Sequence, residues 1–182
     1  MKKIFIILFL IISISETSAS IKEKIIKNLK NTNNLSFNFE QNINDKIEKG
    51  KCILSYPKKI FCKYDLSNQK TLVSNGKSIV IKTSSSYYLY PLERTPLNLI
   101  LNKNYLLEKI SKLEERIIDN KFINYKFSEN DYEINIFFDH NTYNLIGWQT
   151  VDIYQNLSIT FLSSIIKNQK LKKNLFNLPK RN

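Results

Sequence analysis

Apolar and polar residues alternate over many short segments of this 182-residue chain, and this pattern constrains its fold more than any other feature. In the segment 35–41, Leu35, Phe37 and Phe39 alternate with polar residues. Successive side chains of a β-strand point to opposite faces of the sheet, so the pattern predicts a strand with one buried face. We expect further strands at 51–56, 60–66, 71–74, 78–83, 87–90, 117–118, 122–127, 132–138, 144–153 and 156–161.

The residues between these segments indicate an antiparallel sheet. Asn75-Gly76, between two alternating segments, is the strongest hairpin signal in the chain. About ten antiparallel strands with few helices fit a sheet that curls, because flat sheets of that size seldom stay open. The pattern leaves two outcomes open: the sheet closes tightly on its aromatic side chains, or it encloses an apolar hollow.

Two regions have the spacing of amphipathic helices. Isoleucine and leucine recur at helical spacing over 21–33, with lysines on the other faces, which predicts one N-terminal helix. Thr95 is placed to cap a second helical region, with Pro96 at its first position. Apolar residues from there to Ile110 indicate two short helical pieces.

The first residues have the features of a targeting segment. A pair of lysines precedes the apolar run 4–14, and a small, polar stretch follows it up to Ala19. As a helix this run spans about 16 Å, roughly half of the bilayer core, so it is too short for a permanent anchor. We expect a signal peptide over 1–19 and a single soluble domain over 20–182. No cysteine follows the apolar run, so the acylation site of a lipoprotein is missing.

The net charge of +12 has two interpretations. The lysines either form a solvated surface or attract an anionic partner. Nucleic-acid binders usually cluster arginine, whereas arginine occurs here only at Arg94, Arg116 and Arg181. We therefore expect no nucleic-acid partner, and phospholipid head groups are the better candidate for an anionic one.

No catalytic motif stands out in the sequence. It contains neither a G-x-S-x-G nucleophile elbow nor a glycine-rich phosphate loop. His140, the single histidine, lies in an Asp-His-Asn turn and has no second histidine with which to bind zinc. We expect no enzyme activity, no metal and no cofactor.

Cys52 and Cys62 stand five residues on either side of Pro57 within one predicted hairpin. If the turn is centred on Pro57, they are cross-strand neighbours on one face. That placement is compatible with a disulfide and with two free apolar thiols, and an oxidising compartment favours the disulfide.

Several segments share their order and character with one known family. They are Phe37–Gln41, Gly50–Tyr64, Leu72–Lys77, Arg94–Leu97, Ile134–Asp139, Leu145–Trp148 and Leu175–Pro179. In this order they resemble the F-x-Q start, the strand-proline-strand hairpin, the D-G-k turn, the T-P helix start, the terminal strands and the closing motif of the periplasmic outer-membrane lipoprotein carrier (LolA) family.

The resemblance implies a mainly β (α+β) fold, an incomplete, curled antiparallel barrel whose helices form a lid over an apolar cavity. It also implies a periplasmic monomer that receives acylated lipoproteins from an inner-membrane ABC release complex. The protein would deliver them to an outer-membrane receptor or to the outer membrane itself. Each exposed methylene costs about 0.8 kcal/mol, so an acylated anchor needs such a carrier to cross water.

With this fold we expect the acyl chains to contact apolar residues of the strands and the lid. These are Phe37, Phe39, Leu54, Ile60, Tyr64, Tyr88, Tyr90, Leu97, Ile100, Leu101, Phe137, Trp148 and Phe161. The family places an arginine, which holds the lid shut, where this sequence has Tyr56, and we expect Tyr56 and Arg94 to act as the lid latch. By the same alignment Cys52 and Cys62 face the cavity.

Two other functions stay open at this point. One is a related periplasmic protein that binds another lipid or a glycolipid. The other is a sensor or adaptor that holds a protein partner in the same half-barrel.

Overall fold

The computed structural model describes residues 19–66, 68–129, 131–151 and 156–181. The predicted signal peptide, apart from Ala19, lies outside the described residues. The helices are α1 (Ile21–Lys30), the 3-10 helix η1 (Leu92–Arg94), α2 (Leu97–Ile100) and α3 (Lys103–Lys112). The strands are β1 (Asn34–Ile43), β2 (Lys46–Ser55), β3 (Lys59–Tyr64), β4 (Thr71–Asn75), β5 (Ser78–Lys82), β6 (Tyr87–Pro91), β7 (Arg116–Ile118), β8 (Phe122–Glu129), β9 (Tyr132–Asp139), β10 (Leu145–Val151) and β11 (Leu157–Lys167).

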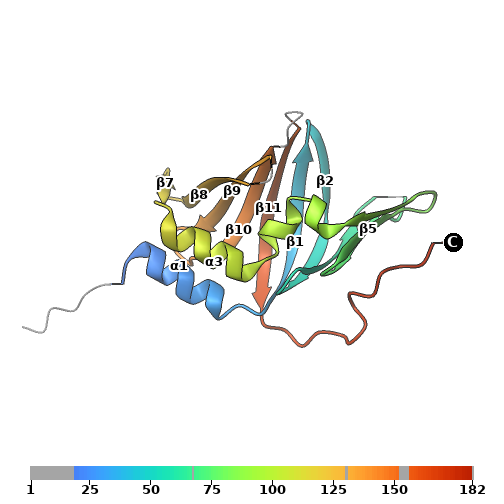
Figure 1. The fold of residues 1–182 in the computed structure, drawn as a ribbon, viewed down its shortest axis with the longest axis horizontal. Helices are drawn as coiled ribbons and strands as arrows, with labels where there is room; N and C mark the ends of the chain where they lie inside the picture. Colours follow the sequence, from blue (N-terminus) through green and yellow to red (C-terminus); the bar gives the residue numbers. More distant parts are fainter. Residues whose placement is uncertain (1–18, 67, 130, 152–155, 182) are drawn as a thin grey trace, which may run out of the picture.

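The eleven strands within the described residues form a single antiparallel sheet, in the order β6-β5-β4-β3-β2-β1-β11-β10-β9-β8-β7. Every neighbouring pair is consecutive in the chain except β1 and β11. Strands β6 and β7 are the two edges, so the curled sheet does not close into a barrel (Figure 1). The structure confirms the predicted curled, incomplete antiparallel barrel.

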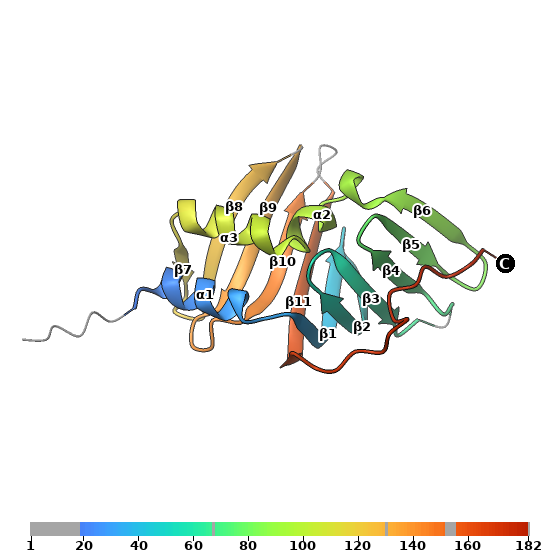
Figure 2. The ribbon, with the colours of Figure 1, turned by 60° about the horizontal axis from the view of Figure 1, so that its bottom comes forward.

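This topology explains the helical lid. The chain leaves the sheet at one edge, β6, and re-enters it at the other edge, β7. The connection therefore has to cross the concave side of the sheet, and it consists of η1, α2 and α3 (Figure 2). Helix α1 lies beside α3 over the β7–β10 side of the sheet.

Two hairpin turns fix the register of the first half of the sheet. Gly76 has a positive φ of 98°, and the Asn75 side chain accepts hydrogen bonds from the backbone of Lys77 and Ser78, as expected for the predicted turn. Between β1 and β2, Asn44 and Asp45 have φ values of 46° and 68°. This two-residue turn was not predicted, and it lengthens both strands relative to the expectation.

The β8–β9 side of the sheet is filled. Helix α1 begins with a reciprocal cap between Ser20 and Glu23 and buries Ile25. Leu106 of α3 and Tyr125 of β8 are fully buried. These buried side chains occupy the space between the helices and this part of the sheet, so a ligand cavity has to lie elsewhere on the concave side.

Candidate functional site

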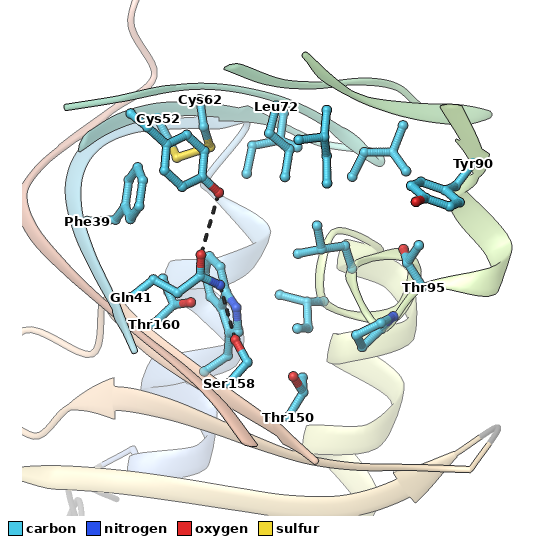
Figure 3. Close-up of a pocket in the computed structure, with 18 of the residues that line it drawn as sticks. Phe39, Gln41, Cys52, Cys62, Leu72, Tyr90, Thr95, Thr150, Ser158 and Thr160 are labelled. Atoms are coloured by element: carbon cyan, nitrogen blue, oxygen red, sulfur yellow. Dashed lines mark hydrogen bonds between the residues drawn. A yellow bond between two sulfur atoms is a disulfide. The ribbon is translucent and has the colours of Figure 1, made fainter. Parts of the chain in front are cut away.

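The concave side is hollow under α2. A cavity of about 430 Å³ lies between the lid and the inner faces of β1–β6, β10 and β11 (Figure 3). Its size falls within the range of roughly 300–1,000 Å³ that is usual for small-molecule sites. Its wall is mostly aliphatic and aromatic, so it can hold an apolar molecule.

Several of the residues predicted for the site line this cavity. Strands β1, β3, β6 and β10 and helix α2 contribute Phe37, Phe39, Ile60, Tyr64, Tyr90, Trp148, Leu97 and Ile100 to its wall. Phe39 packs edge-on against Tyr64, with ring centroids 4.9 Å apart, and Phe37 packs edge-on against Trp148 at 6.5 Å. That these residues contact acyl chains stays a prediction.

Three further predicted residues lie near the cavity without lining it. Leu54 and Leu101 are fully buried and belong to the core that supports the wall. Tyr88 stacks on Tyr90 at the β6 edge, with ring centroids 6.4 Å apart, and its side chain is half-exposed.

The structure places Phe137 and Phe161 on the convex face, so their expected position in the cavity is wrong. The two rings pack on each other 6.4 Å apart, and Phe161 is 49% exposed. In β11 it is Ser158 and Thr160 that face the cavity, while Phe161 and its neighbours of the same parity face outward. Alternation shows that a strand has two different faces, but here the more apolar face is not the inner one.

Four small or polar wall residues were missed by the sequence analysis. Gln41, Thr150, Ser158 and Thr160 line the cavity, but none has a local sequence signature. The available signal was positional. Gln41 lies two residues after Phe39 and therefore shares its face of the strand, and Thr160, directly before Phe161, lies on the face opposite to Phe161.

A disulfide joins Cys52 and Cys62, which are directly opposite each other in the β2–β3 pair with Cα atoms 4.1 Å apart. Both cysteines line the cavity. The bond therefore ties two strands of the cavity wall together.

The lid is not latched in the way that the resemblance implied. The Tyr56 hydroxyl is buried and makes no hydrogen bond to any described residue, and burial raises its pKa. The Arg94 side chain is exposed and borders the cavity, and the Arg94 carbonyl accepts a hydrogen bond from the Tyr132 hydroxyl at 3.3 Å. The lid is instead joined to the β2–β3 turn by the backbone N–H of Lys58, which donates to the Leu101 carbonyl at 2.8 Å.

Thr95 also differs from its predicted role. Its hydroxyl donates to the Leu92 carbonyl at 2.8 Å, and no side chain caps the N-terminus of α2. Thr95 therefore closes η1 in place of starting the next helix.

One ion pair lies behind the cavity wall. Glu48, which is buried, binds Lys70 at 2.5 Å, and the Lys70 ammonium lies 4.2 Å from the centre of the Tyr64 ring. Burial, reinforced by the negative charge of Glu48, raises the pKa of Tyr64, so this hydroxyl keeps its proton at neutral pH. In the part of the chain that the structure describes, no three His, Cys, Asp or Glu residues are grouped to hold a metal, and no helix combines the length and apolarity needed to cross a bilayer.

The family model described as "Outer membrane lipoprotein carrier protein LolA" matches residues 30–179, which is most of the chain. The chain belongs to the LolA family. LolA family members are periplasmic proteins that bind or carry their ligands and are not enzymes. No curated protein sequence matches the chain.

Solved structures with a similar fold include the LolA superfamily protein of Nitrosomonas europaea, with 8% identity, a TM-score of 0.49 and coverage of 87% of this chain and 96% of the other. Mycobacterium tuberculosis lipoprotein LppX has 9% identity, a TM-score of 0.45 and coverage of 84% and 96%. A chain of the Pseudomonas aeruginosa MucA/MucB complex has 8% identity and a TM-score of 0.49, and the match covers 88% of this chain but only 62% of that one.

Proposed function

We propose that this LolA-family protein is a periplasmic carrier that shields the acyl chains of lipoproteins in the cavity under α2. It takes them from an inner-membrane ABC release complex and brings them to the outer membrane or to a receptor there. The observation that carries the proposal is the apolar cavity of about 430 Å³ between the lid and the strands, in a chain whose family match spans residues 30–179.

The thermodynamic need for such a cavity follows from the ligand. Each methylene that leaves water contributes about 0.8 kcal/mol, so a fatty chain crosses an aqueous compartment only when its surface is covered. A carrier also has to release its load, which requires a cover that opens easily. Helix α2 has only four residues, and the Lys58–Leu101 hydrogen bond joins its C-terminal end to the sheet.

The lid residues serve both states in this proposal. Leu97 and Ile100 face the cavity from α2, where they contact the wall when the site is empty. An acyl chain that enters replaces the wall contacts of these side chains with its own methylenes. Because apolar contacts of similar area are exchanged, loading and release differ little in free energy, as transfer between two membranes requires.

We also propose that residues 1–19 are a cleaved signal peptide and that residues 20–182 are the mature, monomeric carrier. The match to the LolA family begins at residue 30 and thus lies entirely within this mature part. Mass determination of the protein recovered from its native periplasm gives the cleavage position directly.

Identification of the native ligand tests the function. The protein is purified from the periplasm of its native organism, and the bound material is identified by mass spectrometry. Lipoproteins with intact acyl chains are the expected result. Free phospholipid or glycolipid would make it a carrier of another lipid, and a stoichiometric folded partner without lipid would make it an adaptor.

A pair of matched variants shows whether the ligand occupies this cavity. Leu97→Glu places a charge on the cavity side of α2, at a position that is only half-buried. Leu89→Glu makes the same change on the outer face of β6, where Leu89 is 55% exposed. We expect the first variant to lose the ligand and the second to keep it.

A further inference from the structure

One corner of the mostly apolar cavity is polar and carries no charged side chain. It is formed by Gln41 of β1, Thr150 of β10, and Ser158 and Thr160 of β11, which are called the polar corner below. In the strand register Gln41 is paired with Thr160, and Thr150 with Ser158. Figure 3 shows these side chains together on the side of the cavity that faces away from Tyr90 and Thr95.

The arrangement of β11 is unfavourable for stability alone. The strand exposes Leu157 by 38% and Phe161 by 49% on the convex face while it turns hydroxyl side chains toward the interior. A strand selected only for stability places its apolar residues inside and its polar residues outside. Local departures of this kind are typical of functional sites.

The hydrogen bonds of the polar corner run in one direction. The Tyr64 hydroxyl donates to Gln41 Oε1 at 3.5 Å, and Gln41 Nε2 donates to the Ser158 hydroxyl oxygen at 3.1 Å. The Ser158 hydroxyl accepts the last of these hydrogen bonds and donates to no described residue. Its O–H group therefore remains available as a donor.

Thr160 supplies a second donor. Its side chain is only 4% exposed, and its hydroxyl has no hydrogen-bond partner among the described residues. A buried hydroxyl without a partner is costly, and such groups in a binding cavity point to a ligand that completes them.

The available groups indicate a neutral hydrogen-bond acceptor as ligand. The polar corner itself carries no charged side chain, and Glu48 is already paired with Lys70, whose ammonium lies over the Tyr64 ring. A carboxylate or phosphate would therefore be desolvated at this corner without a counter-charge. A carbonyl oxygen needs only the two hydroxyl protons.

We infer that the polar corner binds the carbonyl oxygen of an ester or amide that joins a fatty chain to its head, with Thr160 and Ser158 as donors. This inference rests on the proposed acyl-binding function and adds a direction to it. The linkage lies at β1 and β11, and the tail extends past Ile60 and Leu72 toward Ile100 in the lid.

The test compares methyl dodecanoate, which has an ester carbonyl, with tetradecane, which has none. Both probes compete with a fluorescent apolar dye for the full-length protein. Thr160→Val removes the hydroxyl but keeps the shape, and we expect it to weaken the ester about fivefold and to leave the alkane unchanged. Because the empty protein loses an unpaired buried hydroxyl, Thr160→Val should also raise the Tm by about 3 °C.

Two further variants control the result. Thr71→Val makes the same chemical change on β4, away from the cavity, and should alter the affinity of neither probe. If Thr160→Val does not fold, Ser158→Ala at the partly buried end of the polar corner should show the same selective loss.

The outcomes separate the two proposals. If neither probe binds the unaltered protein, the acyl-binding function fails and the inference fails with it. If both bind and Thr160→Val affects them equally, only the polar corner is refuted. The inference is also wrong if sodium dodecanoate, and not the ester, loses affinity in Thr160→Val, because the site would then bind a free carboxylate.

Discussion

The two halves of the sheet are covered by helices of different length, and this difference decides where the cavity lies. Over β7–β9, the ten-residue helices α1 and α3 lie side by side and fill the concave face. Over β1–β5 the cover is α2, with four residues, and a cavity of about 430 Å³ is left beneath it. The same curled sheet thus gives a solid core in one half and a container in the other.

The hollow results from the short lid helix more than from the strands. Both halves present large apolar side chains on their inner faces, for example Phe138 in β9 and Phe37 in β1. In the filled half, Ile110 and Leu106 of α3 are buried in the same core as such side chains. Helix α2 has no room for an equivalent set, so the apolar wall beneath it stays open to a ligand.

The largest expected difference between the halves concerns truncated leucines. Leu106→Ala removes a fully buried side chain of α3, so we expect the free energy of unfolding to fall by about 3 kcal/mol. Leu97→Ala removes a half-buried side chain that already borders empty space, and we expect a loss of no more than about 1 kcal/mol. Urea denaturation measures both, and equal losses would show that the two halves are packed alike.

The disulfide gives a somewhat smaller effect, confined to the hollow half. Its two cysteines are ten residues apart, so opening it in a Cys52→Ala, Cys62→Ala double variant should cost about 2.5 kcal/mol in loop-closure entropy. Hydrogen exchange should quicken in β2 and β3 more than in β8 and β9. Uniform acceleration over the whole sheet would mean that the halves do not open separately.

The smallest effect concerns an ionic contact of the filled half. The Glu129 carboxylate accepts hydrogen bonds from Lys109 and from the Tyr105 hydroxyl, both at 2.9 Å, which ties α3 to β8. These bonds, that of Lys109 first, hold the pKa of Glu129 below its usual value. The same carboxylate, together with burial as the larger cause, raises the pKa of Tyr105 to about 12.

Because the folded pKa of Glu129 lies below the unfolded one, its contribution is present above the ordinary carboxyl pKa and is lost as the pH falls through the lowered value. Glu129→Gln should therefore lower the Tm slightly at pH 7 and leave it unchanged in acid. Glu93→Gln, an exposed position in η1, is the control and should have no effect at either pH. A difference for Glu129→Gln that persists in acid would rule out the ionic explanation.

The sequence predicted the fold well because the features that determine it are local. Alternation identified the strands, and Asn75-Gly76 identified a turn whose glycine has a positive φ in the structure. The Asn44-Asp45 turn was missed because neither residue is glycine, although both adopt positive φ. Asparagine and aspartate tolerate that conformation, so this signal was present but weak.

The site was predicted only in part, since its composition depends on contacts between distant strands. Trp148 and Phe37 line the cavity, whereas Phe161, which was expected there together with the other aromatic residues of the strands, lies on the outer face of β11. Which face of a strand is inside depends on its pairing with β1 and β10, and no local pattern contains that information. The alignment predicted a hydrogen bond from the Tyr56 hydroxyl to the lid. In the structure this hydroxyl has no hydrogen-bond partner among the described residues.

The most direct test of the central claim uses Trp148, the single tryptophan of the chain, as a reporter inside the cavity. The full-length protein is titrated with the methyl ester of a brominated fatty acid, whose bromine quenches tryptophan fluorescence on contact. We expect saturable quenching that the unbrominated ester reverses. Leu97→Glu should abolish this quenching and Leu89→Glu should retain it. Quenching that does not saturate, or that persists unchanged in Leu97→Glu, would contradict the claim that the space under α2 holds an acyl chain.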